Sequence, residues 1–325
     1  DTDRSRGLGD VYKRQIYMLP VLFCSVWFTA CFADKPEQMS VSVTTYNLLS
    51  RQVVHKSPWD DRKQKVGEII RQENHNPDIL GCEESQDEIQ MNDMIAMLSP
   101  DYAYREMGIG ASPRIIFWRK ARFELVESDN VDLLNVYPEY APDEYQTSRY
   151  ANFVRLREKS SGHELLVYLV HVKSGGKRSN EYQLLRRQCI QSLCRVAKAK
   201  SDSLGGMPVI AMGDLNNYAK TVINGVPSAP MTFVENGFVD TFDLAAEHMN
   251  AGYKTYSPQS CIDEGTATPA GVNDRLDYIF VYPPKCAEVR RWAAIINFLP
   301  GSDVRVEKPI PSDHHPVNVR LVLNY

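Results

Sequence analysis

Several apolar, strand-like segments of this sequence end in, or carry, side chains that could do chemistry. These side chains are carboxylates, amides and imidazoles: Asn47, Glu83, Glu84, His171, Asp214, Asn216, Asp277, Asp313 and His314. Functional groups collect at strand ends because a rigid scaffold meets variable loops there. We therefore expect these groups, although far apart in the chain, to converge on one site.

The same side chains share a preference for hard cations. Carboxylates and amides offer oxygen ligands and none of these residues is a cysteine, so Mg²⁺, Mn²⁺ or Ca²⁺ suits them better than a structural zinc. Mg²⁺ is usually held by one or two carboxylates together with phosphate oxygens of the substrate. Glu84 and Asp313 would be sufficient, with Asn47 as a neutral ligand or a hydrogen-bond partner. The pattern indicates phosphate-ester chemistry, in which a cation neutralises charge and a positioned group activates water.

Each motif also has a purely structural interpretation. An Asn after a strand is most often a turn residue, and Gly213–Asn216 is rich in residues that favour turns. His171 could be a hydrogen-bonded core histidine, and Asp313–Pro316 could be a capped turn. Glu83 and Glu84 are neighbours in an extended segment, so they point to opposite faces and only one enters a site easily. The order of the motifs, rather than any single one, favours the functional interpretation.

Strands and helices must bring these residues together. Segments rich in Val, Ile, Tyr and Phe predict strands over Val41–Tyr46, Ile79–Cys82, Ile115–Trp118, Phe153–Leu156, Leu165–Val172, Val209–Met212, Tyr278–Tyr282 and Val317–Leu323. Amphipathic spacing predicts helices over Arg62–Asn74, Ile89–Leu98 and Glu181–Lys200. Asp60 and Asp61 are candidate N-caps of the first helix. Helices follow only some strands, unlike in a doubly wound sheet. We predict an α/β fold of the α+β type, with two mixed β-sheets packed face to face and helices on both outer sides.

The composition is that of a folded globular protein. Hydrophobic residues make up 43% of the 325 residues and charged residues 24%, which excludes a disordered chain, a collagen-like chain and a multi-span membrane protein. The net charge of -4 argues against coating nucleic acid by bulk charge alone, although it leaves a local basic groove open. No repeat or linker divides the sequence after residue 33, so residues 34–325 are expected to form a single domain.

The N-terminus is expected to lie outside that domain. Residues 1–15 are predicted to be a sequencing or cloning artefact, because Asp10–Gln15 resembles a translated sequencing adapter. Residues 16–33 are predicted to be a signal peptide cut after Ala33, since an uncharged apolar run precedes small residues. The protein would then be secreted or periplasmic, with no stable membrane span after cleavage. An N-terminal membrane anchor, or lipidation at Cys31, is the alternative.

Five cysteines follow the apolar run, and none is in a C-x-x-C pair, which argues against a zinc or thioredoxin-type site. Exported proteins can form disulfides. A Cys261–Cys286 disulfide is expected, because both residues fall in the loop-rich C-terminal third.

The order of the motifs resembles the endonuclease/exonuclease/phosphatase superfamily, which has the deoxyribonuclease-I-like fold. The matching segments are Thr45–Asn47, Pro77–Glu84, Val170–Ser174, Gly213–Asn216, Asp274–Ile279 and Ser312–Val317. The resemblance implies a four-layer α/β sandwich with a divalent metal, Mg²⁺ first and Mn²⁺ or Ca²⁺ otherwise, at one end. It also implies that residues 34–325 form one catalytic domain.

The resemblance further implies a role for each residue. Asn47, Glu84 and Asp313 would belong to the metal site. Asp214 would orient or deprotonate the attacking water, Asn216 and His171 would face the phosphate, and His314 would contact or protonate a phosphate oxygen while Asp277 holds it. Two departures from the family pattern bear on this: Glu83 stands where the family often has Gln, and His315 adjoins His314. The register favours Glu84 and His314.

The substrate is less clearly indicated, because the motifs serve the phosphate and the metal. A monomeric nuclease or phosphodiesterase is expected, with nucleic acid as the partner. Its groove candidates are Arg149, Tyr150, Lys173, Lys177 and Arg178. A sphingomyelinase would need an exposed apolar hairpin; Trp292–Leu299 is the nearest candidate, but it contains a segment typical of a buried strand. The sequence also leaves open an inositol-phosphate phosphatase of the same fold and a non-catalytic binding relative.

Overall fold

A computed structural model describes residues 37–51, 57–72, 75–85, 87–106, 114–133, 150–175, 179–271 and 274–325. The chain divides into two units, Asp1–Asp34 and Lys35–Tyr325, and all described residues belong to the second. The predicted artefact and signal peptide lie outside the described residues. Within the described ranges, no helix has both the length and the apolar character needed to cross a membrane.

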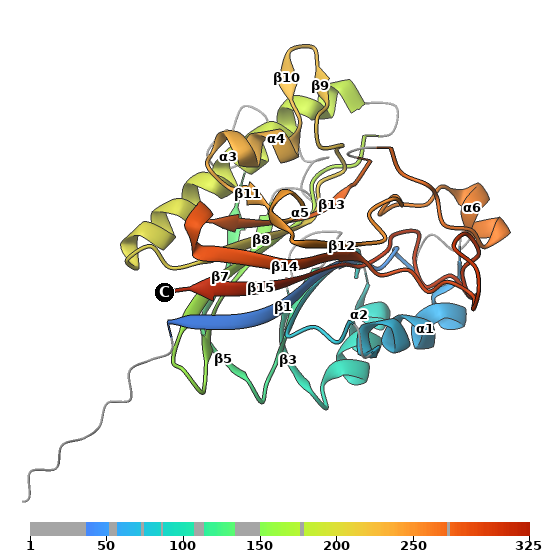
Figure 1. Cartoon of the computed structure of the whole chain (residues 1–325), viewed down its shortest axis with the longest axis horizontal. Coiled ribbons are helices and arrows are strands. Elements are labelled where there is room, and N and C mark those ends of the chain that lie inside the picture. The colour runs from blue at the N-terminus through green and yellow to red at the C-terminus, as the bar shows by residue number, and fades with distance from the viewer. Residues whose placement is uncertain are drawn as a thin grey trace, which may run out of the picture. The chain divides into compact units, whose positions relative to one another are not determined.

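The first sheet has seven strands, with β1 near its centre (Figure 1). From edge to edge it contains β12 (Glu247–Met249), β14 (Ala287–Ala294), β15 (Val317–Asn324), β1 (Gln38–Asn47), β2 (Ile79–Glu83), β4 (Ile115–Arg119) and β3 (Tyr102–Glu106). β1 pairs antiparallel with β15 and parallel with β2, so Asn47 lies opposite Glu83. Parallel pairing therefore places the carboxyl ends of β1 and β2 side by side at the same end of the sheet.

The second sheet has six strands. Its order is β11 (Val239–Asp240), β13 (Asp277–Tyr282), β8 (Val209–Asp214), β7 (Glu164–Val170), β6 (Tyr150–Glu158) and β5 (Phe123–Asp132). β8 runs parallel to β7 and antiparallel to β13. The last residue of β8, Asp214, is the cross-strand partner of the first residue of β13, Asp277. Two acidic residues 63 positions apart in the sequence numbering are thereby made neighbours.

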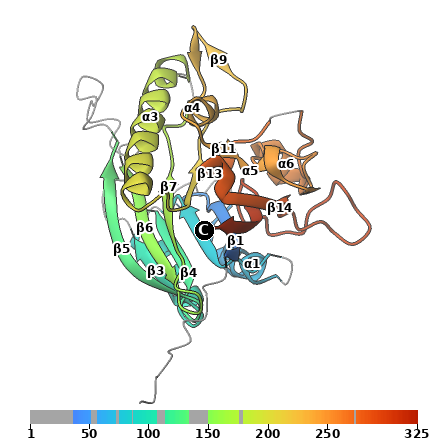
Figure 2. The ribbon, with the colours of Figure 1, turned by 60° about the vertical axis from the view of Figure 1, so that its left-hand side comes forward.

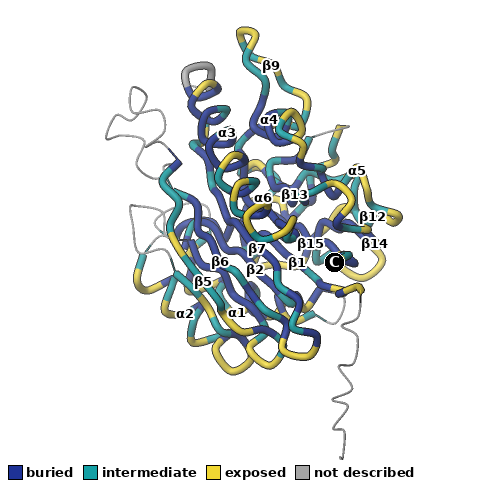
Figure 3. Tube along the Cα trace, turned by 90° about the vertical axis from the view of Figure 1, so that its left-hand side faces the viewer, coloured by how far each residue is buried: buried dark blue, intermediate teal, exposed yellow. Residues whose placement is uncertain are grey.

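Alternate residues of both sheets face each other and form the central core. Val41 and Val43 from the first sheet pack in one cluster with Val167 and Leu169 from the second. Gly81 leaves room for a side chain of the opposite sheet, since a Cβ there would be 2.6 Å from the Cε of Met212. Figure 3 shows that the strands carry most of the buried segments. Close packing of this kind holds the strand ends, and the side chains on them, in fixed relative positions.

Helices cover the outer face of each sheet. α1 (Trp59–Arg71) and α2 (Glu88–Leu98) share a cluster with outward residues of β1, β2 and β4, while α3 (Ser179–Ser203) and α4 (Ala229–Glu235) pack on the second sheet. Figure 2 shows α3 lying along that sheet. The predicted face-to-face mixed sheets with outer helices are confirmed. The remaining short elements are β9 (Val222–Ile223), β10 (Val226–Pro227), α5 (Thr241–Leu244), α6 (Gln259–Glu264) and the 3-10 turn η4 (Pro284–Cys286).

Two details of the sequence analysis are wrong. α1 begins at Trp59, after Pro58, so Asp60 and Asp61 lie in its first turn and do not cap it. Cys261 and Cys286 are both free thiols. Cys286 packs in the central core between the sheets, whereas Cys261 lies on α6, whose neighbours form a separate small cluster around Val306. Both residues come from the C-terminal third, but the fold assigns them to different cores.

Candidate active site

The end of β1 places the amide of Asn47 where the two sheets meet. Its Nδ2 donates to Glu84 Oε1 and to Asp214 Oδ2, at 3.1 Å in both cases, and its Oδ1 accepts from the Leu49 N–H at 3.0 Å. Glu84 follows a strand of the first sheet and Asp214 ends a strand of the second. Asn47 therefore links the two sheets as a hydrogen-bond donor to one carboxylate from each.

Of the two neighbouring glutamates, Glu84 is the one that hydrogen-bonds to Asn47, whereas Glu83 hydrogen-bonds to Thr45. Glu84 has a left-handed φ of 57°, and its carboxylate accepts from the Ser50 N–H at 2.9 Å. Burial works against its charge, but His171, the Ser50 N–H and the Asn47 amide together lower the pKa of Glu84. Glu83 is fully buried, accepts from the Thr45 hydroxyl at 2.5 Å, and has its pKa raised well above the usual value by burial. The pKa values of the two neighbouring carboxyl groups are therefore shifted in opposite directions, and the lowered one belongs to Glu84, which bonds to Asn47.

Asp214 is the buried carboxylate at the centre of the group. Its Oδ1 accepts from the Asn216 N–H at 2.8 Å, and its Oδ2 is 3.5 Å from His171 Nε2 and 3.8 Å from His314 Nε2. Burial, reinforced by the charge of Asp277 and opposed by that of His314, raises its pKa to about 7. A carboxyl with this pKa can take up and release a proton near neutral pH.

Gly213 explains how Asp214 comes so close to the neighbouring strand. Its φ is 146°, and a Cβ at this position would lie 1.7 Å from the carbonyl oxygen of Val170 in β7. Only glycine permits this approach. The contact brings the end of β8 beside the end of β7, where His171 follows directly.

His171 and Asn216 form the next part of the site. Asn216, which has a left-handed φ of 46°, directs its Nδ2 to His171 Nε2 at 3.1 Å and to the Val172 carbonyl at 3.0 Å. Burial lowers the pKa of His171 to about 4, although nearby Glu84 opposes this. The ring is therefore neutral at pH 7, with Nε2 accepting the hydrogen bond from Asn216.

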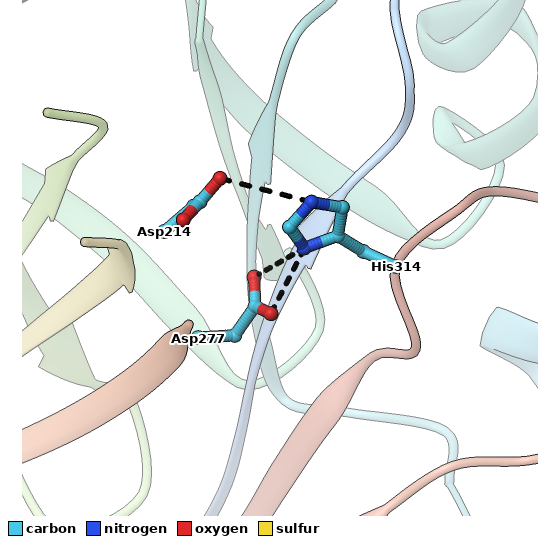
Figure 4. A group of neighbouring side chains, drawn as sticks. All are labelled: Asp214, Asp277 and His314. Atoms are coloured by element: carbon cyan, nitrogen blue, oxygen red, sulfur yellow. Dashed lines mark hydrogen bonds and ion pairs between the residues drawn. The ribbon is translucent and has the colours of Figure 1, made fainter. Parts of the chain in front are cut away.

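His314, unlike the neutral His171, is paired with a carboxylate, that of Asp277 (Figure 4). Its Nδ1 lies 2.9 Å and 3.1 Å from the two oxygens of Asp277, and its Nε2 is directed towards Asp214. Burial opposes the charge, but the carboxylates of Asp277 and Asp214 outweigh it and raise the pKa of His314 well above the ordinary value. This ring is an imidazolium, fixed in one orientation at the base of the site.

The two residues beside His314 occupy different places. Asp313 is buried, its carbonyl accepts from the Ser257 N–H at 2.7 Å, and its negative charge acts on both His314 and Arg62. The His315 ring lies 3.4 Å from the Ser257 hydroxyl, and burial lowers its pKa to about 4. Ser257 thus contacts both neighbours of His314, while His314 alone of the three is hydrogen-bonded to Asp277.

The donor atoms favour a hard cation at Glu84. Ligand atoms of Asp214, Asp277 and His314 lie within 4.8 Å of one another, although a protonated imidazolium offers no lone pair to a metal. The Glu84 side chain is anionic and 26% exposed, and it accepts a hydrogen bond from the Asn47 Nδ2. A carboxylate held in this way fits an oxygen-preferring divalent ion.

Three positioning residues were missed by the sequence analysis. Ser312 donates its hydroxyl to the Asn47 carbonyl at 2.7 Å, and the Thr255 hydroxyl accepts from the Asp277 N–H at 3.3 Å. Arg62 is fully buried on α1. Arg62 could have been noticed, because it lies on the helix face that Val66 identifies as apolar.

Of the groove candidates, Tyr150 and Lys173 are described by the structure. Tyr150 is half-buried at the start of β6, and Lys173 Nζ lies 5.6 Å from the centre of the Tyr182 ring. Arg149, Lys177 and Arg178 lie outside the described residues.

Comparison with known proteins agrees with this geometry. The endonuclease/exonuclease/phosphatase family matches the sequence over residues 44–314. The chain belongs to this family, whose members are hydrolases that act on phosphoester bonds. The predicted resemblance is confirmed. Curated proteins yield no match to the sequence.

Solved structures show the same fold. An endonuclease/exonuclease/phosphatase family protein from Bacteroides thetaiotaomicron is 22% identical, with a TM-score of 0.68 over 88% of this chain and 96% of that one. A mannosyl-6-phosphatase from the same organism is also 22% identical, with a TM-score of 0.60 over 86% and 99%. D. rerio TDP2, complexed with a single-strand DNA product, is 14% identical, with a TM-score of 0.57 over 87% and 98%.

Proposed function

We propose that this protein is a divalent-metal-dependent phosphodiesterase that attacks its substrate in line with water, and that its substrate is nucleic acid. The observation that carries the proposal is the position of Asp214. This buried carboxylate lies within 4 Å of two histidines in opposite charge states and accepts hydrogen bonds from two amides. Such an arrangement can hold a phosphate and a water molecule at the same time.

Asp214 is proposed to orient the attacking water and accept its proton. Its raised pKa of about 7 matches the working range of a general base. The Asn216 N–H fixes one of its oxygens, which leaves the other directed towards the histidines. The carboxylate is therefore oriented before the substrate arrives.

The two histidines are proposed to act on the phosphate. His314, kept charged by Asp277, would neutralise negative charge that develops on a phosphate oxygen. His171, kept neutral by burial, would face the phosphate together with Asn216. A divalent ion held by Glu84, with Asn47 and Asp313 beside it, would supply further charge neutralisation when bound.

A monoester of a sugar is the second candidate substrate. The observation in its favour is the similarity to a mannosyl-6-phosphatase, at 22% identity, while the similarity to TDP2 with its DNA product favours nucleic acid. The site would serve either substrate, because its groups contact the phosphate and not the leaving group.

A substrate panel tests the proposal. Single-stranded DNA, duplex DNA, RNA, bis(p-nitrophenyl) phosphate, mannose 6-phosphate, inositol phosphates and sphingomyelin would each be incubated with Mg²⁺, Mn²⁺ or EDTA. We expect turnover of nucleic acid that EDTA abolishes and that Asp214→Asn lacks. Turnover of mannose 6-phosphate alone would favour the second candidate, and hydrolysis that survives in EDTA would refute the metal dependence.

Export is proposed on the apolar run of residues 16–33. Expression of the full sequence, followed by N-terminal sequencing of protein recovered outside the cytoplasm, is expected to show Asp34 as the first residue. A monomer is also proposed, and light scattering of the purified protein tests it.

A further inference from the structure

Arg62 is a fully buried arginine on α1 that is bonded to the backbone of the loops around the site. Its guanidinium donates to four carbonyl oxygens: Nε to Ser57 at 2.9 Å, Nη1 to Leu48 at 2.5 Å and to Pro311 at 2.6 Å, and Nη2 to Leu49. Burying a guanidinium is costly unless its donors are satisfied. An apolar residue would be less costly to bury on this helix face, so the presence of an arginine needs a functional explanation.

The bonded loops are those that carry the proposed cation ligands. Leu48 and Leu49 follow Asn47 directly, and the next N–H, of Ser50, donates to Glu84 Oε2 at 2.9 Å. Pro311 lies two residues before Asp313. One Nη1 atom therefore joins segments 263 positions apart, from Leu48 to Pro311.

The charge of Arg62 is directed at the same place. Burial lowers its pKa to about 10, and the charges of Asp313 and Glu84 oppose that change. Arg62 remains a cation at pH 7 and offsets part of the repulsion between Asp313 and Glu84.

We propose that Arg62 is a positioning residue that sets the spacing between the Leu48–Ser50 loop and Asp313, and thereby the affinity of the site for its divalent ion. The proposal rests on the proposed function, because that function places a cation at Glu84. Lysine cannot replace the guanidinium here. A single ammonium group lacks the planar fork that reaches three loop carbonyls and Ser57 together.

Arg122 provides a matched control. Its guanidinium also joins distant segments, since it binds Asp78 at 2.7 Å, Glu158 at 2.8 Å and the Ser40 carbonyl. Ser40 lies seven residues before Asn47 on β1, which is roughly 23 Å along an extended strand. Arg122→Met therefore removes a comparable structural link at a distance from the site.

The experiment measures Mg²⁺ binding to the metal-free protein by calorimetry, at a temperature well below every unfolding midpoint. The variants are Arg62→Lys, Arg62→Met and Arg122→Met, with Glu84→Gln as the reference for losing the ion ligand. We expect Arg62→Lys to weaken Mg²⁺ binding about tenfold and Arg62→Met up to about a hundredfold, the usual range for partners of ligand-bearing groups. Arg122→Met should change the affinity by less than twofold, whatever its effect on stability.

A second readout needs neither the ion nor turnover. Hydrogen exchange in the metal-free protein should become faster at residues 48–51 and 312–314 in Arg62→Lys, and remain unchanged there in Arg122→Met. If Arg62→Met does not fold, Arg62→Lys decides both measurements. Wild-type Mg²⁺ affinity in Arg62→Lys would overturn the positioning role, even if stability falls or exchange becomes faster.

The two proposals fail in different ways. If Glu84→Gln weakens Mg²⁺ binding and Arg62→Lys does not, the positioning role is wrong and the cation site stands. If neither the wild-type protein nor Glu84→Gln binds Mg²⁺, Mn²⁺ or Ca²⁺, the proposed function is wrong and the positioning role falls with it.

Discussion

The site lies where strand ends of the first sheet meet strand ends of the second, and each of these two edges holds a carboxyl group. The pKa values of the two carboxyl groups are shifted in opposite directions. At the edge of the first sheet, Glu84 has a 26% exposed side chain, hydrogen bonds from Ser50 and Asn47, and a lowered pKa. At the edge of the second sheet, the side chain of Asp214 is 2% exposed and burial raises its pKa to about 7. The difference arises from solvent access and from the neighbouring charges, since Asp277 is paired across the strand from Asp214.

This difference separates two tasks that phosphoester hydrolysis requires. A carboxylate that stays ionised can retain a cation throughout the reaction, whereas one with a pKa near 7 can exchange protons with water. We therefore assign cation binding to the edge with Asn47 and Glu84, and proton transfer to the edge with Asp214 and Asp277. The following predictions, from the largest effect to the smallest, test this division.

Asp214→Asn should cause the largest loss. It removes the proton acceptor while keeping the size and most hydrogen bonds of the side chain, so we expect turnover to fall about 10³-fold. Mg²⁺ affinity should change little, because the ion is assigned to the other edge. Steady-state kinetics and calorimetry measure both quantities, and Asp202→Asn at an exposed position serves as control. Turnover within tenfold of wild type would contradict the assignment of Asp214.

His314→Gln should lower turnover by about a hundredfold, because the imidazolium next to the phosphate is lost. Asp277→Asn should act through the same ring, since Asp277 holds it at 2.9 Å. The double variant is therefore expected to be no slower than the slower single variant, as for residues that act as a unit. If the losses of turnover in the two single variants add up in the double variant, Asp277 has a role separate from that of His314.

Glu84→Gln should raise the Mg²⁺ concentration for half-maximal rate by about ten- to a hundredfold, because an anionic ligand becomes neutral. Glu83→Gln is the matched control: the neighbouring side chain accepts from Thr45, its pKa is raised by burial, and glutamine has nearly the same shape. Its Mg²⁺ requirement should stay within about twofold of wild type. The reverse order of the two variants would assign the ion to Glu83.

The pH dependence of stability should differ in sign between the two edges. The folded pKa of Asp214 is raised, so its contribution in the metal-free protein is complete below about pH 4 and lost as the pH rises to about 7. As the pH rises over that range, the free energy of unfolding of Asp214→Asn should therefore increase by about 1 kcal/mol relative to that of the wild type. This is less than the full pKa shift of Asp214 would give, because His314 shares the proton.

Glu84→Gln should behave in the opposite way. The folded pKa of Glu84 is lowered, so its contribution is present above pH 4.5 and lost as the pH falls below that value. Urea unfolding at several pH values measures both variants. The same slope for both would contradict the division between the edges.

Much of the fold could be predicted, because strand-forming segments are visible as apolar runs. All eight expected strands are present within slightly different bounds, and so are the three expected helices. The expected strands did not include β3, β5, β14 or the short strands β9 to β12. β5 (Phe123–Asp132) is an edge strand with mostly polar, partly exposed residues, which hides it in the sequence. The disulfide was misjudged because distance along the chain does not report which core a cysteine joins.

The candidate site was predictable as a set of side chains but not as an arrangement. Glu83 and Glu84 are identical residues in sequence, and only the structure shows that Glu84, with its left-handed φ of 57°, bonds to Asn47 while Glu83 bonds to Thr45. Arg62 looked like one charge among several at the start of a helix. Its use depends on carbonyls from Leu48 to Pro311 that only folding brings together.

The sequence by itself determined which chemical groups this protein has and where along its strands they occur, because apolar runs and the polar residues that end them are local features. The tertiary structure alone decided which of those groups are charged and which touch. A pKa depends on burial and on charges within a few ångströms, and at this site those charges come from both sheets and from residues more than two hundred positions apart.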